Sequence, residues 1–306
     1  MIKWLSLFTV CSILYGADYP DETKLGNELK PLLKFTVMGC GPYHPKVKKA
    51  IKQYVELDNK EKSSKFIAHL GDICSGKDAK QMHEAADGGE SVFSEMRSLL
   101  YENNTIPSFF LIGDNETRDQ IDSARAFSFW QKHLLEPNEV FAFKINRQKH
   151  RPENFSFVLD DVLIIGIHKI GGKDGGEAYW KETRKDAEIW IAQQFQTYPN
   201  SKAAVILAHA RTSNKLHEEK IFALVESYKK PVLYINANLH KWRYLPSDGP
   251  PNYTRVQLDL IHSKSEEKKG PYYPPMQVIV TEDKETPFLF DRRLNKPEWI
   301  KAGELK

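Results

Sequence analysis

Two carboxylates in the sequence follow apolar runs that end in glycine. Residues 66–72 read FIAHLGD and residues 108–116 read SFFLIGDNE, so Asp72 and Asp114 each stand directly after a Gly. A Gly beside the acid permits a sharp turn out of a strand, and open α/β sheets hold ligands beyond the carboxyl ends of their strands. Carboxylate oxygens suit divalent metal ions. The two runs therefore predict metal or phosphate chemistry at one edge of a sheet.

Further potential ligands also follow apolar runs. They are Cys40, Tyr43, His44, His168, His209, Asn238 and His240. Imidazole and thiolate suit Zn²⁺ and Fe, and carboxylates also suit Mn²⁺. Structural alternatives stay open at this point, because Asp72 could be a helix N-cap and Asp114 a turn residue. His209 and His240 could be buried histidines with hydrogen-bond partners, and we expect His168 to be a loop residue.

Alternating strand-like and helix-like runs must position these side chains. Apolar runs predict strands at 34–39, 66–70, 108–112, 155–159, 162–167, 203–208, 231–236, 254–260, 276–281 and 287–290. Apolar residues at helical spacing predict helices at 45–57, 91–101, 122–135, 180–197 and 216–229. The alternation predicts a two-sheet α/β sandwich. The strands that follow one another after about residue 231 are expected when a second sheet packs on the first.

One domain accounts for this pattern. We expect an N-terminal lead segment at 18–33, a domain at 34–291 and a C-terminal tail at 292–306, with polar, mobile loops at 76–90 and 262–275. The chain has 306 residues, 41% of them hydrophobic and 28% charged, which is ordinary globular composition. Its 44 basic and 41 acidic residues are mixed along the chain, so nucleic acid binding is not indicated. The pattern defines no oligomeric state.

The first 17 residues resemble a secretory signal peptide. Lys3 precedes an apolar stretch from Trp4 to Leu14, and Gly16-Ala17 lead into an acidic segment. We therefore expect export, with the mature chain secreted, periplasmic or otherwise outside the cytoplasm. A buried first strand or an uncleaved anchor is the alternative. No later segment has the roughly 18 consecutive apolar residues that a membrane span requires.

Two cysteines would remain after removal of a signal peptide that contains Cys11. Cys40 and Cys74 both follow apolar runs, in KFTVMGC and IAHLGDIC. If the two strands are neighbours, the sulfurs could meet at the sheet edge near Asp72, and an oxidising compartment would permit a disulfide. Free thiols and a metal thiolate are the alternatives, although two cysteines alone form no zinc framework.

The order of these motifs resembles the calcineurin-like metallophosphoesterase family. That family has D-x-H, G-D-x-x, G-N-H-D/E, a strand-end His and G-H-x-H in this order. The chain is most similar to the branch with G-D-T-P-Y, G-D-I-K-S-G and G-D-N-E, through GCGPY, GDICSG and GDNE. The similarity covers roughly residues 34–260, and GDICSG and GDNE are its most specific parts. It implies an α/β sandwich with one or two divalent metal ions, Mn, Fe or Zn.

The resemblance also implies ligand positions. Asp72 corresponds to the bridging carboxylate, and Asp114 stands where most members have an Asn ligand. His209 and His240 correspond to the strand-end His and the last His of G-H-x-H. Three positions depart from the family pattern: Cys40 replaces the first Asp, Pro42 replaces a ligand His, and Asn238 replaces the first His of G-H-x-H. One ion would have Asp72, His240 and Cys40, and the other Asp72, Asp114, His209 and Asn238.

The function that the resemblance implies is an exported phosphoesterase. It would hydrolyse a phosphate ester by metal-activated water. Asn115, which stands where most members have a His, would orient the substrate because an amide does not titrate. Water or a nearby residue such as His44 would protonate the leaving group. Tyr43, Arg118 and Arg243 would contact the substrate, of which only the phosphate-ester class is defined. Because Cys40, Pro42 and Asn238 depart from the pattern, the alternative is a binding module that has lost catalysis.

Overall fold

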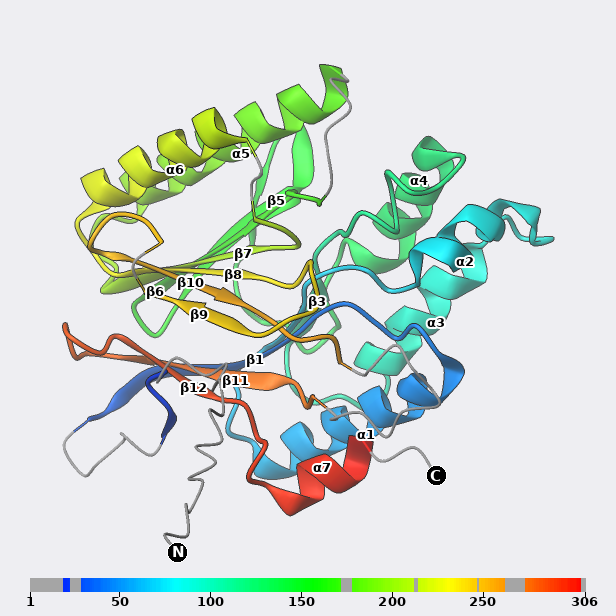
Figure 1. Cartoon of the computed structure of the whole chain (residues 1–306), viewed down its shortest axis with the longest axis horizontal. Coiled ribbons are helices and arrows are strands. Elements are labelled where there is room, and N and C mark those ends of the chain that lie inside the picture. Colours follow the sequence, from blue (N-terminus) through cyan, green and yellow to red (C-terminus); the bar gives the residue numbers. More distant parts are fainter. Residues whose placement is uncertain are drawn as a thin grey trace, which may run out of the picture.

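Two β-sheets pack face to face between two outer layers of helices, as Figure 1 shows. The structure is a computed structural model that describes residues 19–22, 29–171, 178–211, 214–246, 248–261 and 273–303. The predicted two-sheet α/β sandwich is confirmed. The predicted signal peptide at 1–17 lies outside the described residues, as does most of the predicted loop at 262–275.

The first sheet holds the strands that carry the Cys40 and Asp72 motifs. It has the order β12-β11-β1-β2-β3. Its strands are β1 (Pro31–Met38), β2 (Ile67–His69), β3 (Ser108–Phe110), β11 (Met276–Thr281) and β12 (Phe288–Asp291). β2 runs parallel to both β1 and β3, with Ala68 paired to Val37 and to Phe109. The carboxyl ends of these three strands therefore meet at one edge, which brings their motifs together.

The second sheet carries the histidine motifs. Its order is β4-β5-β6-β7-β8-β10-β9. The strands are β4 (Asn146–Gln148), β5 (Arg151–Leu159), β6 (Val162–Ile167), β7 (Ala203–Ala208), β8 (Val232–Asn236), β9 (Arg243–Leu245) and β10 (Tyr253–Gln257). β6, β7, β8 and β10 form a parallel block. The strands after 231 are thus divided between the two sheets and do not form one sheet of their own.

Helices cover the outer faces of both sheets. They are α1 (Pro45–Glu61), α2 (Gly76–Gln81), the short 3₁₀ helix Met82–Glu84, α3 (Glu90–Tyr101), α4 (Ser123–Leu134), α5 (Ala178–Thr197), α6 (Lys215–Tyr228) and α7 (Pro297–Gly303). The five predicted helices are present with small shifts at their ends. The predicted mobile loop at 76–90 is wrong in its first half, because Ser75 caps α2 by accepting a hydrogen bond from the Asp78 N–H.

Apolar side chains form three cores that match these layers. The central core lies between the sheets and includes Phe35, Phe66 and Phe157. A second core lies under α1, α3, α4 and α7, and a third joins α5 and α6 to the second sheet. β6, β7 and β8 are buried along their whole length. Strands covered on both faces read as continuous apolar runs, which explains why β6 and β7 were predicted with their observed ends and β8 within one residue.

The C-terminal segment packs against the rest of the domain. Arg293 is buried and pairs with Asp58 of α1 at 2.6 Å between Nη2 and Oδ1. Its guanidinium also lies 3.7 Å from the ring centroid of Trp299 in α7. Losing one partner of a buried ion pair strongly destabilises a protein. Residues 293–303 therefore contribute to the fold, although only a C-terminal tail was predicted there.

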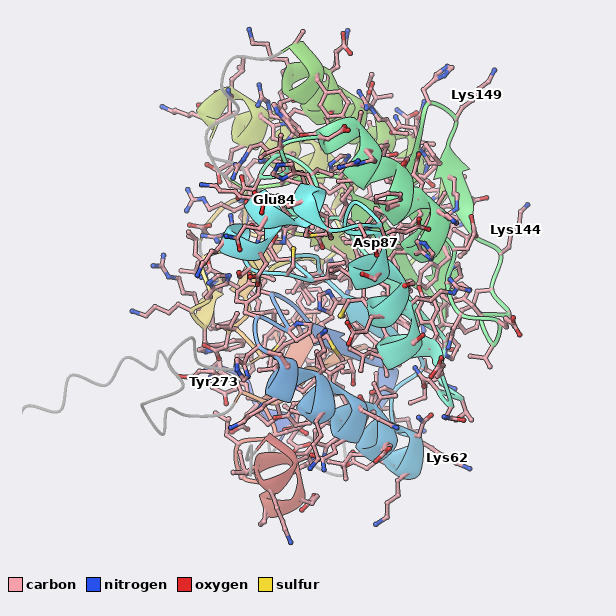
Figure 2. All side chains as sticks on the ribbon, turned by 90° about the vertical axis from the view of Figure 1, so that its right-hand side faces the viewer. Lys62, Glu84, Asp87, Lys144, Lys149 and Tyr273 are labelled. Carbon is pink, nitrogen blue, oxygen red and sulfur yellow. The ribbon has the colours of Figure 1, made fainter. Side chains whose placement is uncertain are left out.

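The surface carries charges of both signs. Figure 2 shows Lys62, Lys144 and Lys149 pointing outward on the same side as Glu84 and Asp87. Within the part of the chain that the structure describes, no helix is both long and apolar enough to cross a membrane.

Candidate metal centre

The predicted ligands converge on Asp72. Two groups of side chains each bring their ligand atoms within 4.8 Å of one another. We call Cys40, Asp72 and His240 the cysteine half of the centre, and Asp72, Asp114 and His209 the histidine half. Asp72 belongs to both halves, which is the arrangement that a carboxylate bridging two ions requires.

The backbone at the centre adopts a conformation that is unusual for residues with side chains. Cys40, Asp72 and His240 have φ values of 54°, 60° and 56°. Left-handed backbone costs energy in residues other than glycine and is concentrated at functional sites. Gly71, with φ at 88°, has no room for a side chain, because a Cβ there would lie 2.5 Å from the Gly113 nitrogen. The close approach of the two Gly-Asp turns explains the Gly that precedes each acid.

Hydrogen bonds hold Asp72 in this conformation. The buried carboxylate of Glu116 accepts from the backbone N–H groups of Asp72 and Ile73, each at 3.0 Å. The Asn115 N–H donates to Asp72 Oδ1, also at 3.0 Å. The GDNE motif therefore positions the shared carboxylate through its last two residues. Glu116 was not predicted as a site residue, although its place in the GDNE motif was the available signal.

His209 presents its Nε2 atom to the two carboxylates. Its Nδ1 lies 2.8 Å from the Leu70 carbonyl oxygen, so Nδ1 carries the proton and donates it there. Nε2 lies 3.4 Å from Asp72 Oδ1 and 3.6 Å from Asp114 Oδ1, and has no hydrogen-bond partner among the described residues. A histidine whose Nδ1 is fixed on a carbonyl is the usual form of a metal ligand.

Electrostatics at the histidine half favour a bound cation. Burial raises the pKa of Asp72 to about 6, against the opposing influence of His209. Burial would lower the pKa of His209, but Asp72, Asp114 and Glu116 together raise it to about 10. Burial would raise the pKa of Asp114, as it does that of Asp72, but the neighbouring His209 lowers the pKa of Asp114 below its ordinary value. Without an ion, a protonated His209 thus supplies the positive charge between two carboxylates, a position where a divalent ion also fits.

The cysteine half is arranged around the other oxygen of Asp72. The Cys40 sulfur lies 3.9 Å from Asp72 Oδ2 and 3.5 Å from the Ala237 carbonyl oxygen. The Tyr43 hydroxyl donates to Asp72 Oδ2 at 3.0 Å and lies 3.1 Å from His240 Nε2. Burial and the charge of Asp72 raise the pKa of the Cys40 thiol. Tyr43, predicted as a substrate contact, thus lies among the candidate ligands.

Both described cysteines are free thiols. The Cys74 sulfur faces the Asn115 carbonyl oxygen at 3.9 Å, whereas the Cys40 sulfur faces Asp72 and Ala237. The disulfide alternative is therefore wrong in this structure. Cys40 remains available as a thiolate ligand once an ion displaces its proton.

Asn238 and Arg118 lie at the outer side of the histidine half. A Cβ placed on Gly171 would lie 1.8 Å from Asn238 Nδ2 and 2.5 Å from Asp114 Oδ2, so this glycine packs directly against both side chains. Arg118 donates from Nη1 to the Gly171 carbonyl oxygen, and its Nη2 lies 3.5 Å from Asp114 Oδ2. Asn238 and Arg118 thus adjoin Asp114, one as a potential weak ligand and one as a cation.

The other predicted site residues have different surroundings. The Asn115 amide donates to the Cys74 carbonyl oxygen at 2.7 Å. His44 is the N-cap of α1 and accepts from the Lys46 N–H at 3.2 Å. Arg243 is exposed at the start of β9. His168 is a loop residue directly after β6, as predicted, but it is buried, and its Nδ1 lies 2.9 Å from Glu153 Oε1.

His69 connects two motif loops beneath the centre. Its Nε2 donates to the Gly41 carbonyl oxygen at 2.8 Å, and its Nδ1 accepts from the Gly71 N–H at 3.2 Å. Burial lowers its pKa to about 4. His69 was not predicted as a site residue; the feature that could have indicated it is its position as a single polar residue within an apolar run.

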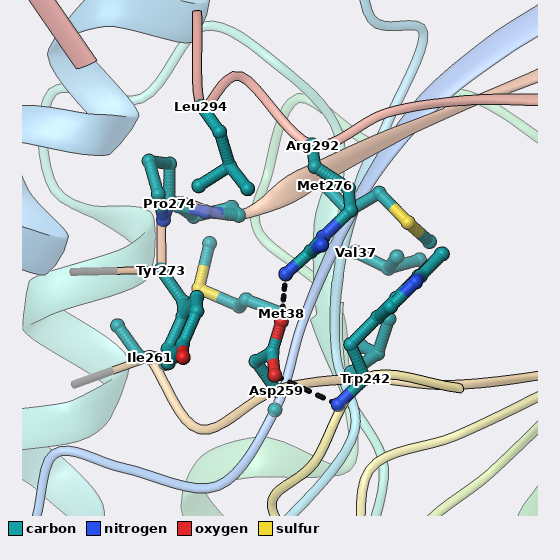
Figure 3. Close-up of a pocket in the computed structure, with 13 residues that line it drawn as sticks. Val37, Met38, Trp242, Asp259, Ile261, Tyr273, Pro274, Met276, Arg292 and Leu294 are labelled. Carbon is teal, nitrogen blue, oxygen red and sulfur yellow. Dashed lines mark hydrogen bonds and ion pairs between the residues drawn. The ribbon is translucent and has the colours of Figure 1, made fainter. Parts of the chain in front are cut away.

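A separate pocket lies behind the first motif. It has an empty volume of about 350 Å³ and includes Gly39, Trp242, Asp259, Tyr273 and Arg292 in its lining. Figure 3 shows the Asp259 carboxylate between Arg292 and the Trp242 N–H, at 2.5 and 2.7 Å. None of the candidate ligands lines this pocket. Its charged groups are paired with each other, so it is not the metal centre.

Comparisons with known proteins support the fold. No family model and no curated protein matches the sequence. The structure of GAP50, the anchor in the inner membrane complex of Plasmodium, matches with a TM-score of 0.50 at 11% identity, over 89% of this chain and 94% of that one. A dimetal phosphatase from Danio rerio matches with a TM-score of 0.50 at 10% identity, over 85% of this chain and 99% of that one. The chain has the calcineurin-like metallophosphoesterase fold that its motifs predict.

Proposed function

We propose that the protein is a metal-dependent phosphoesterase. The observation that carries the proposal is the position of Asp72, one carboxylate shared by two groups of potential metal ligands. The unpartnered Nε2 of His209, between Asp72 and Asp114, supports a cation at the histidine half. Similarity to a dimetal phosphatase of the same fold is consistent with this chemistry. The ions that suit these ligands are Mn, Fe or Zn.

The residues of the chain have separate tasks in this proposal. A bound divalent ion supplies Lewis acidity toward a phosphoryl oxygen and lowers the pKa of water. Asp72, Asp114 and His209 hold the ion, and Asn238 is a weak additional ligand. Arg118, beside Asp114, contacts phosphate oxygens through its guanidinium, which is suited to bidentate contacts with phosphate.

The remaining proposed contacts are assigned from the order of the motifs. His44 follows Tyr43 in the first motif loop, and its imidazole is the proposed general acid that protonates the leaving group. Asn115 does not titrate, so its proposed role is to orient the substrate and, through its N–H, to position Asp72. Arg243 is a proposed contact for a more distant part of the substrate. The sequence-based proposal of export rests on residues 1–17, and protein sequencing of the N-terminus from culture medium would test it.

Hydrolysis of a chromogenic ester tests the proposed activity. We expect p-nitrophenyl phosphate, or its diester bis(p-nitrophenyl) phosphate, to be hydrolysed only after addition of Mn²⁺ or Zn²⁺. Asp72→Asn removes the anionic ligand that both groups share and should lower the rate at least about 100-fold, as loss of a metal-site partner does. Asp161→Asn, at an exposed carboxylate outside both groups of ligands, is the matched control. Equal rates for the wild type and Asp72→Asn would contradict the proposal.

A non-catalytic binding module is the second candidate. The observation that favours it is the crowded outer side of the histidine half, where Gly171 packs against Asn238 and Asp114 and where Arg118 bonds to the Gly171 carbonyl. A protein of the same fold is described as an anchor. Metal binding without hydrolysis of either ester, with Mn²⁺, Zn²⁺ or Fe²⁺, would favour the module over the enzyme.

A further inference from the structure

The Tyr43 hydroxyl lies where a fourth ligand of the cysteine half would be. Its oxygen is 3.0 Å from Asp72 Oδ2 and 3.1 Å from His240 Nε2. The Cys40 sulfur is 3.9 Å from the same Asp72 oxygen. One sulfur, two oxygens and one nitrogen from four side chains therefore lie close together.

The spacing of these atoms matches the shell of a small tetrahedral ion. Zinc bonds of about 2.0 Å to oxygen and nitrogen place neighbouring ligand atoms roughly 3.3 Å apart, and a bond of about 2.3 Å to sulfur places sulfur and oxygen roughly 3.5 Å apart. The observed separations between Tyr43 and its two neighbours, 3.0 and 3.1 Å, are close to the first value. The observed 3.9 Å between Cys40 and Asp72 requires only a small contraction to reach the second.

The backbone fixes Tyr43 relative to Asp72. The Cys40 N–H donates to the Gly71 carbonyl oxygen at 3.1 Å, and the Gly41 N–H donates to the Asp72 carbonyl oxygen at 2.7 Å. The ring of Tyr43 meets the ring of His240 edge to face, with centroids 5.5 Å apart. A rigid ring on a tethered loop holds its hydroxyl in place, as a preorganised ligand requires.

We propose that Tyr43 is a metal ligand and completes, with Cys40, Asp72 and His240, a four-ligand site that prefers Zn²⁺. Thiolate and imidazole are preferred zinc ligands, whereas Mn²⁺ prefers oxygen ligands alone. The ion replaces the protons of the Cys40 thiol and the Tyr43 hydroxyl, and both protons leave to solvent. The histidine half, with two carboxylates, one imidazole and an amide, lacks this preference, so the two halves differ in how strongly they favour Zn²⁺.

This inference goes beyond the proposed function. It assigns a ligand and a metal preference that hold whether or not the protein hydrolyses an ester. The opposing interpretation is that the Tyr43 hydroxyl fills the cysteine half and keeps an ion out. The two interpretations predict changes of opposite sign when the hydroxyl is removed, which makes them separable by a binding measurement.

Zinc titration of Tyr43→Phe tests the assignment. The wild-type chain, stripped of metal, should bind two Zn²⁺ ions in competition with a chromogenic chelator. Tyr43→Phe should bind one ion with unchanged affinity and the other at least about 100-fold more weakly. Loss of a residue that only orients a metal ligand weakens metal binding by about 10–100-fold, and loss of a ligand itself should weaken it at least as much. Tyr101→Phe is the matched control, because it also removes a tyrosine hydroxyl, one that donates to the Glu136 carbonyl oxygen at the surface.

Cobalt spectra keep the test independent of folding. Co²⁺ bound to a thiolate has a charge-transfer band in the near ultraviolet, which we expect in the wild type and not in Cys40→Ser. Tyr43→Phe should require far more Co²⁺ to reach the same band, with a circular dichroism spectrum like that of the wild type. Equal or tighter metal binding by Tyr43→Phe, or a wild-type chain that binds a single ion without this band, overturns the assignment.

Discussion

The two halves of the centre share one carboxylate but differ in the origin and chemistry of their other ligands. Asp72 directs Oδ1 toward His209 and Oδ2 toward the Tyr43 hydroxyl. The histidine half draws Asp114 and His209 from the ends of buried strands of two different sheets. The cysteine half draws Cys40 and His240 from turns with left-handed backbone. A fold that supplies one shared carboxylate can therefore hold two positions with different metal preferences.

The halves also differ in burial. His209 is completely buried, with its Nδ1 fixed on a carbonyl of the neighbouring sheet. His240 is partly exposed and follows Leu239, whose side chain is 61% exposed. An exposed ligand exchanges with solvent more easily than a buried one. We therefore expect the histidine half to retain its ion longer than the cysteine half during dialysis against a chelator.

The largest effect is expected where the two halves meet. Asp72→Asn removes the charge that both ions share while leaving an oxygen that can accept from the Asn115 N–H. Metal content measured by mass spectrometry should fall from two ions per chain to none after dialysis. Asp161→Asn, at an exposed carboxylate, should keep both ions. If Asp72→Asn retained two ions, the shared-carboxylate arrangement would be wrong.

Substitution of His209 or His240 should remove the ion of one half and leave the ion of the other half in place. His209→Gln should remove the ion of the histidine half, and His240→Gln that of the cysteine half, each leaving one ion per chain. The cobalt charge-transfer band from Cys40 should survive in the first variant and disappear in the second. If His209→Gln lost the band from Cys40 while it still bound one ion, the ligands would not be divided into the cysteine half and the histidine half.

A smaller effect is expected from Glu116, which touches neither ion directly. Glu116→Gln keeps the shape of the side chain, but only one of its two ends can accept from the N–H groups of Asp72 and Ile73. We expect roughly 10–100-fold weaker binding of both ions and a loss of about 1–3 kcal/mol of unfolding free energy. Weakening in one half alone would contradict the role of Glu116 in positioning Asp72.

The smallest effect concerns the pH dependence of stability beneath the centre. His69 titrates at about 4 when folded because burial lowers its pKa, and at about 6.5 when unfolded. The unfolded chain therefore binds more protons between these values, and the contribution of His69 is complete above about pH 6.5 and lost as the pH falls toward 4. The full difference between these two pKa values corresponds to about 3 kcal/mol.

Urea unfolding of the metal-free chain checks the effect of His69. Between pH 7 and pH 4.5 the wild type should lose about 2 kcal/mol more unfolding free energy than His69→Gln, whose amide can still bond to Gly41 or Gly71. Parallel pH profiles for the two chains would show that His69 does not titrate between these limits. Since His69 contacts no ligand atom directly, metal content at pH 7 should be the same in both.

The sequence predicted the parts of the centre that follow strands. Asp72, Asp114 and His209 could be predicted as ligands because each follows a continuous apolar run. The roles of Glu116 and His69 could not be predicted, since they depend on contacts between loops that lie apart in the chain. Tyr43 was predicted as a substrate contact and not as a metal ligand. Its distances to Asp72 and His240 depend on the turn at Cys40 and Gly41, which could not be predicted from the sequence.

The helices and strands divide in the same way into those that the sequence predicted and those that it did not. The long buried strands β6, β7 and β11 were predicted with their observed ends. The short strands β4 and β9 were missed, because three residues at a sheet edge give no clear alternation. α7 was missed for a similar reason, since it is short and its packing depends on the contacts of Arg293 and Trp299.

Anomalous scattering at the zinc absorption edge, from crystals grown with Zn²⁺, tests the central claim most directly. The shared-carboxylate arrangement predicts two peaks roughly 3.5–4 Å apart, one beside each oxygen of Asp72, with the Tyr43 hydroxyl bonded to the ion that also contacts Cys40. A single peak that does not contact Asp72, or none near it, would contradict the account.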